Sequence, residues 1–479
     1  MGVKNLWSIL SPVAEKSPLW ELQGKVVAID LSGWVCDSEN CSQNNNSQKN
    51  MYLRNLFFRT SNLLLVGAIP IFVFDGEAPQ LKYNIMNKRM NDNTNVPKKN
   101  MVRKRLNSLQ KQCELLFKIL GVASVYSPGE AEKLCAVLNE NGIANGVITQ
   151  DSDCFLYGAR VVYRNFISTG SGSVDIYSME TIENKLQMGR NKMIAMSLLC
   201  GCDYDEKGVD GVGKETAFKF LQPLDDSIVL ERLRHWRNDI VLNAAEKDIK
   251  SQTNDIKLEI KIRNKAIKNQ DFPSNDLIEE FLNTPKCPKV VVKWMLPDIN
   301  AFVTFAATKL CWEEDYAIEK FLPLLTRWHL LYDDDHKCGV EIADIIKARV
   351  SKGISCFEIK WKDYDMTTVE PRECVSLRYS DKVSAYIEKN TKPAKKPKNK
   401  KKVVAEKATI NSLSDLTNKM STMDITAKDK KSKVPKKVKG PMDNFIRNQQ
   451  VLEDSLTLSD FDCDTTDLDL SSIVNRIIS

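Results

Sequence analysis

Lys25-Val-Val-Ala-Ile-Asp30 is a short run of apolar, mostly β-branched residues that ends in an aspartate. Ile69-Pro-Ile-Phe-Val-Phe-Asp75 and Gly146-Val-Ile-Thr-Gln-Asp151 have the same form. Such runs are typical of buried parallel strands, and helical apolar patterns at 106–120 and 131–138 separate the second from the third. Residues 1–220 are therefore expected to form an α/β core with a mainly parallel sheet flanked by helices. Ligands of open α/β sheets bind beyond the carboxyl ends of the strands, so the three aspartates are expected to converge on one site.

The composition narrows the chemistry that this site can perform. The 479 residues are enough for two or three domains, and a hydrophobic content of 42% can fill their cores. The 13 cysteines include no CxxC pair, which indicates reduced thiols with neither disulfides nor zinc. The chain has 3 histidines, scattered in sequence, and no apolar run of transmembrane length. The groups that remain to catalyse any hydrolysis are the carboxylates.

Beyond the core, three segments follow that differ in sequence pattern and composition. An apolar segment within residues 221–330 predicts a helical extension that continues to pack on the core. Residues 337–385 predict a small β domain, because Ile354-Ser-Cys-Phe-Glu-Ile-Lys-Trp361 alternates as a strand does. Residues 390–479 have the composition of a disordered tail, first basic and then acidic.

Seven carboxylates are candidate metal ligands: Asp30, Asp75, Glu130, Glu132, Asp151, Asp153 and Asp203. Hard oxygen ligands suit Mg²⁺, for which Mn²⁺ can substitute, and carboxylates that share metals lose their mutual repulsion. Two ions about 3.5–4 Å apart would activate water and stabilise both oxygens of an in-line displacement at phosphorus.

Each of these residues also has a purely structural interpretation. A strand-end aspartate is often a turn residue or a helix cap. Ser127-Pro128-Gly129-Glu130 has the form of a capping box, with Pro128 at the first helical position. Glu132 can be a first-turn acid that complements a helix dipole, and Asp203 can belong to a polar turn.

The order and surroundings of these residues resemble the flap endonuclease/XPG superfamily and, within it, the GEN/Yen-type Holliday junction resolvases. The matching segments are Met1–Trp7, Val27–Ser32, Val73–Pro79, Gly129–Glu132, Thr149–Asp153 and Leu199–Tyr204, followed by Gly211-Val-Gly213. The GEN character comes from Asp30–Cys36, Arg54–Arg59, Phe155–Ala159 and Tyr163–Asn165. The resemblance covers roughly the first 330 residues. It implies a PIN-like XPG nuclease core with N and I regions, in which all seven carboxylates line a two-metal site.

The resemblance also implies roles for basic residues and glycines. Lys82 and Arg89 match the superfamily Lys and Arg that approach the scissile phosphate, where Asp30, Glu130 and Asp151 would act with them in catalysis. The alternative for both is a solvated helix face. Residues 200–222 resemble the helix-two-turn-helix that holds duplex DNA, and its relatives bind a potassium ion in the turn. DNA contacts are expected from the set Gly2, Gly211, Gly213 and Lys214.

Two further positions near the start of the chain bear on the resemblance to the superfamily. Gly2 opens a segment that resembles the wedge packing near the junction, although core packing is the expected role of Trp7. Cys36 stands where flap endonucleases place a stacking tyrosine, which puts base stacking there in doubt.

Residues 345–371 resemble the chromodomain that GEN-type resolvases carry. Methyl-lysine reading needs an aromatic cage, for which Trp361 and Tyr364 match two positions. Val340 stands where the third aromatic belongs, which disfavours methyl-lysine reading and favours contact with DNA or with the nuclease. The lysine-rich runs 391–403 and 428–439 predict nuclear localisation signals or DNA-binding arms.

These observations predict a nuclear, Mg²⁺-dependent, structure-selective endonuclease of DNA repair and recombination that leaves 5′-phosphates. It would resolve four-way junctions by paired symmetric incisions as a dimer and also cut 5′ flaps. The interval between Asp75 and Glu130 is short and contains a polar run at 91–100, so a free 5′ end would not have to thread an arch. Two alternatives stay open: a monomeric 5′-flap or repair endonuclease, and a catalytically silent chromatin-binding protein.

Overall fold

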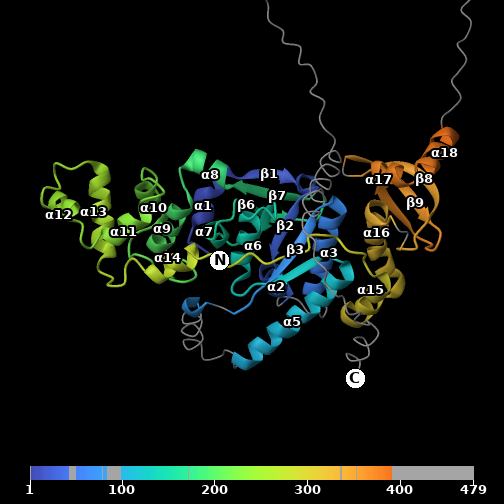
Figure 1. Cartoon of the computed structure of the whole chain (residues 1–479), viewed down its shortest axis with the longest axis horizontal. Helices are drawn as coiled ribbons and strands as arrows, with labels where there is room; N and C mark the ends of the chain where they lie inside the picture. Colours follow the sequence, from blue (N-terminus) through green and yellow to red (C-terminus); the bar gives the residue numbers. More distant parts are fainter. Residues whose placement is uncertain are drawn as a thin grey trace, which may run out of the picture.

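The computed structural model describes residues 2–42, 50–77, 79–82, 99–170, 172–334, 337–351 and 353–390. A central sheet with helices on both faces separates a helical lobe from a small second sheet, and these lie at opposite ends of the molecule (Figure 1). The predicted short arch and Arg89 fall on residues 83–98, and the predicted tail falls on residues 391–479. Both segments lie outside the described residues.

The central sheet has seven strands in the order β1-β7-β6-β5-β2-β3-β4. The strands are β1 (Glu15–Pro18), β2 (Val26–Asp30), β3 (Ile69–Phe74), β4 (Ala123–Tyr126), β5 (Gly146–Ile148), β6 (Val161–Ile167) and β7 (Ser173–Ser178). The five strands from β6 to β4 run parallel, and β7 is antiparallel to both β6 and β1. The predicted α/β class and its three predicted strands are confirmed, with β2 lying between β5 and β3.

Alternation along the central strands divides the core into two layers. In β2, Ala28 faces one layer and Ile29 faces the other, because successive side chains of a strand point to opposite faces. The first layer contains α6 (Ala131–Glu140), α7 (Asp153–Leu156) and α9 (Arg190–Cys200). The second layer contains α3 (Met51–Val66), α5 (Lys99–Leu120), α15 (Ile299–Phe305) and α16 (Glu314–Tyr332). Strands buried on both faces explain the continuous apolar runs in the sequence.

The helical lobe follows α9. It consists of α10 (Lys214–Leu221), α11 (Val229–His235), α12 (Ile240–Lys247), α13 (Asn254–Ala266) and α14 (Asn275–Leu282). Side-chain caps fix the starts of three of these helices: Asp239 accepts from Leu242 N, Thr253 from Ile256 N and Ser274 from Leu277 N. Buried Glu259 joins α13 to α11 by accepting two bonds of 2.6 Å from Arg232 and one of 3.0 Å from Trp236 Nε1.

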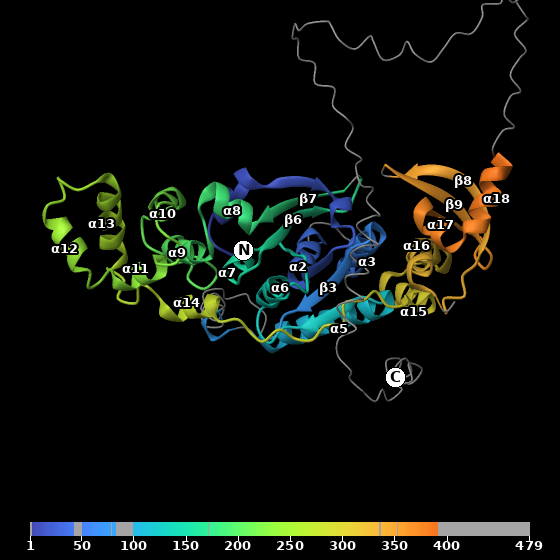
Figure 2. The same ribbon diagram turned by 45° about the horizontal axis from the view of Figure 1, so that its top comes forward.

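The segment from 283 to 298 leaves α14 and runs past β4 and the end of α5 toward α15 (Figure 2). Met295 N donates to Gly121 O at 2.8 Å, and Trp294 Nε1 donates to Leu120 O at 2.9 Å. These contacts cover the end of α5 and the approach to edge strand β4. Apolar residues of this region, among them Trp294 and Phe302, are buried, as the sequence predicts for a continued core.

The second sheet has the antiparallel order β10-β9-β8, built from β8 (Ile342–Ser351), β9 (Ile354–Trp361) and β10 (Thr367–Pro371). Helices α17 (Arg372–Arg378) and α18 (Ser380–Asn390) follow it. This module shares an apolar cluster with α16, to which Leu322 and Leu325 contribute. Arg327 of α16 is buried, donates to Glu370 of β10 at 2.7 Å, and also reaches Leu65 O of α3 at 2.7 Å. The predicted small β domain is present.

Six further elements complete the described fold. Near the amino end, α1 (Leu6–Leu10) is followed by the turns Ser11–Val13 and Leu19–Leu22, and α2 (Leu31–Ser42) continues directly from β2. Helix α8 (Met179–Leu186) follows β7, and the turn Ala306–Leu310 joins α15 to α16. Among the helices that the structure describes, none is both long and apolar enough to cross a membrane.

Candidate active site

Three carboxylates are placed by the carboxyl ends of parallel strands. Asp30 is the last residue of β2, Asp75 directly follows β3, and Asp151 follows β5 by three residues. Asp30 is held in place by the amides of Ser32 (3.0 Å) and Gly33 (3.1 Å), which donate to its two oxygens. Since β2 lies between β3 and β5 in parallel register, the predicted convergence of these aspartates is confirmed.

Two more carboxylates come from the start of α6. This helix begins at Ala131, and its first amide donates to Asp75 Oδ1 at 2.8 Å. Glu130 occupies the N-cap position, but its side chain makes no capping bond. The capping-box alternative is therefore wrong, as is the placement of Pro128 at the first helical position. Because Asp75 caps the helix from β3, Glu130 and first-turn Glu132 are available to the site.

Asp151, Asp153 and Asp203 complete the group. Asp151 N donates to Thr149 Oγ1, and Asp151 Oδ1 accepts from Asp153 N, both at 3.0 Å. Asp153 is 4% exposed, and no group in the described part of the chain hydrogen-bonds to its Oδ1. Asp203 lies in the turn after α9, between Cys202 and Asp205, which form a β-bridge.

Electrostatic coupling shows that the seven carboxylates form one cluster. Burial and the charge of Asp75 raise the pKa of Asp30 to about 7, and burial and Asp203 raise the pKa of Asp151 to about 6. Burial also raises the pKa of Glu132, with Asp30, Asp151, Asp75 and Glu130 adding to the effect. The pKa of Asp153 is raised by burial and by Asp151, Asp203 and Glu130. These shifts arise because charged carboxylates lose solvation and repel one another.

Lys82 lies beside the cluster as a counter-charge. Its ammonium forms an ion pair with Glu130 and lies 5.9 Å from the centre of the Tyr204 ring. Burial alone would lower the pKa of Lys82, but the attraction of Glu130, Glu132 and Asp203 outweighs burial and raises it. A single ammonium cannot balance seven carboxylates. The oxygen-only donor set and the unpartnered oxygen of Asp153 fit hard divalent cations such as Mg²⁺ or Mn²⁺.

Tyr204 and Tyr157 are site residues that the sequence analysis missed. Tyr204 OH donates to Glu130 Oε2 at 2.7 Å, and the two tyrosine hydroxyls are 2.6 Å apart. Both side chains are buried, so they hold one oxygen of Glu130 in a fixed direction. The sequence held a signal for Tyr204, because this tyrosine directly follows Asp203 in the matching segment Leu199–Tyr204.

The amino-terminal segment packs against the cluster. Gly2 has a left-handed φ of 88°, and a Cβ at this position would overlap Asp151 Oδ1 and Ser152 Oγ. Val3 N donates to Ser152 Oγ at 3.0 Å, and Lys4 N donates to Gly201 O at 3.0 Å. Only glycine fits at position 2, which places the backbone of this segment beside the carboxylates.

Trp7 serves the packing role that was expected for it. Its ring contacts Phe155 and Tyr177, and Nε1 donates to Gln150 O at 2.9 Å. Cys36 is exposed on α2.

Comparison with known proteins places this site in a family. Residues 1–95 match the XPG N-terminal domain, and residues 121–203 match the XPG I-region. The Flap endonuclease GEN of Drosophila pseudoobscura pseudoobscura is 33% identical over an alignment that covers 100% of this chain and 79% of that protein. The chain belongs to the GEN family of XPG nucleases. Membership makes it a metal-dependent, structure-specific endonuclease.

Other GEN relatives are longer than this chain. Flap endonuclease GEN of Drosophila melanogaster is 34% identical over 83% of this chain and 66% of its own length. Flap endonuclease GEN homolog 1 of Homo sapiens is 31% identical over 81% of this chain, which spans only 50% of the human protein. The crystal structure of human GEN1 in complex with Holliday junction DNA has 34% identity and a TM-score of 0.67, and the match covers 81% of this chain and 98% of that one.

The turn that was expected to bind duplex DNA lies between α9 and α10. Gly211 has a φ of 72° and is exposed, which suits close approach by a ligand. Gly213 is the N-cap of α10 with a φ of −93°, a conformation that any residue can adopt. A Cβ here would meet no other atom within 4 Å, so the space around its backbone is open to a ligand. Lys214 begins α10, and its ammonium donates to Ser8 Oγ at 2.9 Å. The predicted DNA residues Gly2, Gly211, Gly213 and Lys214 thus lie on the amino-terminal segment or in this turn.

Within the described part of the second sheet, two of the positions compared with a methyl-lysine cage are buried. Trp361 is fully buried and donates from Nε1 to Thr368 Oγ1 at 2.9 Å, and Val340 is 4% exposed. The Trp361 ring is therefore part of the core shared with α16. Tyr364 packs partly against the same cluster.

One cluster outside the carboxylate site brings together His329, Asp333 and Cys338. Both nitrogens of His329 are engaged at 2.7 Å, Nδ1 with Asp333 and Nε2 with Tyr379 OH. Asp333 also accepts from the amides of Lys337 and Cys338. These bonds make the cluster an internal connection between α16 and the segments on either side of the second sheet.

Proposed function

We propose that this GEN-type nuclease resolves four-way DNA junctions as a homodimer by two symmetric incisions, and that it also cuts 5′ flaps. The convergence of seven carboxylates, with a buried oxygen of Asp153 left for a cation, carries the proposal. The human relative of similar fold was crystallised with Holliday junction DNA, which supports the choice of substrate.

The residues that would hold two Mg²⁺ ions, or Mn²⁺ in their place, are Asp30, Asp75, Glu130, Glu132, Asp151, Asp153 and Asp203. When bound, such ions lower the pKa of water and stabilise charge on the phosphate oxygens. Tyr204 keeps Glu130 oriented, and the Ser32 and Gly33 amides keep Asp30 oriented. Lys82 is near enough to the cluster to exchange its contact with Glu130 for one with the scissile phosphate. Arg89, proposed for the same task, lies outside the described residues.

Duplex DNA would be held at two places, beside the carboxylates at Gly2 and in the turn before α10. Gly2, Gly211, Gly213 and Lys214 would contact the backbone of the DNA, with amides at the start of α10 donating to phosphate. Carbonyls of the turn 208–213 would hold a potassium ion, which would add positive charge near the DNA backbone. Such contacts position a duplex without selecting its sequence, as a junction-cutting enzyme requires.

The proposed domain arrangement assigns residues 1–220 to the nuclease, 221–330 to its helical extension, 337–385 to a chromodomain-like module and 390–479 to a basic and then acidic tail. Because the second sheet shares a core with α16 and buries Trp361, this module is proposed to pack on the nuclease rather than to read methyl-lysine. The lysine runs support nuclear localisation. Removing residues 391–479 should relocate a tagged protein to the cytoplasm, and its retention in the nucleus would reject this assignment.

A plasmid that extrudes a cruciform tests the reaction. A dimer that makes paired cuts within the lifetime of one complex converts the supercoiled circle directly to linear DNA. Independent cuts release a nicked circle first. Linear product at limiting enzyme supports junction resolution. Nicked circle as the lasting product would instead identify a monomeric flap endonuclease, and the absence of cutting with Mg²⁺ would reject nuclease activity.

A further inference from the structure

The face of α13 carries a row of lysines that begins at the turn before α10. Lys257, Lys261 and Lys265 are spaced by four residues, so they follow one side of the helix. Lys265 Nζ donates to Gly211 O at 2.7 Å, which joins the row to the proposed duplex-binding turn. The row extends about 12 Å from there at 1.5 Å per residue.

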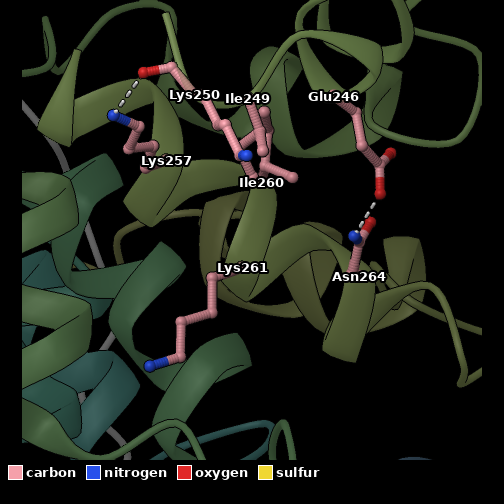
Figure 3. A pocket seen from close by; sticks show the side chains of 7 residues that line it. All are labelled: Glu246, Ile249, Lys250, Lys257, Ile260, Lys261 and Asn264. Atoms are coloured by element: carbon pink, nitrogen blue, oxygen red, sulfur yellow. Dashed lines mark hydrogen bonds between the residues drawn. The ribbon is translucent and has the colours of Figure 1, made fainter. Parts of the chain in front are cut away.

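The outer part of this row borders a hollow of about 670 Å³ between α12 and α13. Figure 3 shows Lys257 beside Lys250 on one side of the hollow, with Lys261 extending separately below them. Lys257 Nζ donates to Lys250 O at 3.2 Å. Ile249 and Ile260 also line the hollow, which therefore combines three ammonium groups with an apolar surface.

Carboxylates of the lobe do not neutralise these lysines. Glu246, the one acidic residue lining the hollow, accepts from Asn264 at 2.6 Å and from Arg263 at 3.4 Å. Glu259 is engaged by Arg232 and Trp236, and Asp248 accepts from Ser251 at 2.6 Å. Within the described part of the chain, none of Lys250, Lys257 and Lys261 forms an ion pair.

We propose that the α13 row, Lys257, Lys261 and Lys265 together with Lys250, binds the sugar–phosphate backbone of one duplex arm beyond the helix-two-turn-helix. A single phosphate would need only one cation, whereas this surface presents a row of lysines that are about 6 Å apart along the helix. Such a line matches a polyanion with one phosphate per strand for every ~3.4 Å of duplex. The apolar surface of Ile249, which is 40% exposed, suits the sugars. The proposal rests on the proposed function only in that the partner is DNA.

The test compares wild type with Lys257→Gln/Lys261→Gln, which removes two charges and leaves polar side chains that are one atom shorter. Affinity for a fluorescent four-way junction is measured in EDTA, where nothing is cut, over a range of salt concentrations. Loss of two phosphate contacts should flatten the slope of log K against log salt by about 1.8. The ratio of the wild-type affinity to that of the Gln variant should therefore fall about tenfold between about 50 and 200 mM salt.

Two controls exclude general effects of charge or folding. Lys247→Gln/Lys389→Gln makes the same charge change at exposed positions outside the hollow, and Lys257→Arg/Lys261→Arg restores cations at the row. Both should keep the wild-type slope. A junction series with arms shortened one base pair at a time should remove the difference between wild type and the Gln variant over a span of about four base pairs.

Equal slopes for wild type and the Gln variant would overturn the proposal, as would an affinity loss that persists on the shortest arms or is equally large on single-stranded DNA. Because the measurement involves no cleavage, its outcome is separate from the cruciform experiment. Failure to resolve junctions would leave a flattened slope standing as evidence for the α13 contact.

Discussion

Asp30 and Asp151 are buried carboxylates whose raised pKa values reflect the lack of solvent and the proximity of other acids. Replacing either with asparagine preserves its shape but removes the charge that a metal requires. We expect Asp30→Asn and Asp151→Asn each to reduce cutting by more than the ~100-fold that loss of an outer partner can cause. Junction affinity should change little, because the phosphate contacts proposed at the turn before α10 and along α13 do not involve these carboxylates.

The measurement is cleavage of a four-way junction in Mg²⁺ alongside binding in EDTA. Asp175→Asn is a matched control, since Asp175 accepts from Asn165 in an exposed position outside the cluster. If either cluster variant cuts the junction at the wild-type rate, the carboxylate that it lacks is not a metal ligand.

Tyr204 differs from the carboxylates because it acts through Glu130 and is not itself a proposed ligand. Tyr204→Phe leaves the ring in place and removes one donor. We expect the Mg²⁺ concentration for half-maximal cutting to rise about tenfold, while the rate at saturating Mg²⁺ recovers most of its value. Mn²⁺ binding followed by electron paramagnetic resonance should weaken in parallel. Tyr126→Phe is the control, because the Tyr126 hydroxyl contacts Glu114 away from the site.

A lower plateau with an unchanged Mg²⁺ midpoint would contradict the positioning role of Tyr204. Unaltered Mn²⁺ binding would contradict it as well.

At the scale of elements, the buried pair of Arg327 and Glu370 joins α16 to β10, and Arg327 also donates to α3. Removing one member of such a pair leaves an uncompensated charge in the core. Arg327→Met should therefore destabilise the protein by roughly 3–5 kcal/mol. Arg327→Met/Glu370→Leu should recover most of that loss, because both charges are then absent.

Urea unfolding of the two variants checks this expectation, with fluorescence of the buried tryptophans as the signal. A double variant that is less stable than Arg327→Met would show that the pair contributes more than charge compensation.

Much of the fold was predictable from local sequence patterns. Strands β2, β3 and β5 are buried on both faces, so their apolar runs are continuous and easily recognised. Strands β6 and β7 were not predicted, because they are partly exposed and mix polar with apolar residues. Strand β1 contains only Glu-Lys-Ser-Pro and owes its conformation to pairing with β7. No local pattern could reveal that dependence.

The start of α6 shows that local sequence patterns also fail to predict some contacts within the site. Ser127 to Glu130 has the spacing of a capping box, yet the cap comes from Asp75, 56 positions earlier in the chain. A tertiary contact thus replaced the local one and freed Glu130 for the cluster. The seven carboxylates were found because their order within matching segments is a family property. The partners Tyr157 and Tyr204 were missed because sequence spacing does not show which buried hydroxyls meet.

At the scale of the whole molecule, the cluster should govern how stability depends on pH. Asp30, with a pKa of about 7, and Asp151, with a pKa of about 6, titrate above their usual value of 3.8. Between about pH 4 and 7 the folded protein therefore binds more protons than the unfolded chain, and stability falls as pH rises through this window. In EDTA we expect a lower Tm at pH 8 than at pH 5.5.

Mg²⁺ should reverse this trend, because it binds the deprotonated carboxylates and adds more to Tm at pH 8 than at pH 5.5. Thermal unfolding with and without Mg²⁺ at both pH values provides the test. Asp30→Asn/Asp151→Asn should flatten the dependence in EDTA. A wild-type Tm in EDTA that rises with pH across the window would contradict this explanation.

The docking of residues 2–7 against Gln150, Ser152 and Gly201 has a consequence for biosynthesis. During synthesis this segment must wait for Gly201, about 200 residues later in the chain, a delay of roughly 10–40 s at ordinary rates of synthesis. Asp203 emerges in the same interval. A partly synthesised chain therefore lacks the last carboxylate and leaves the segment of Gly2 without its later partners. Asp203 directly precedes the turn proposed to hold duplex DNA, so the nascent chain gains its complete set of carboxylates almost together with that turn.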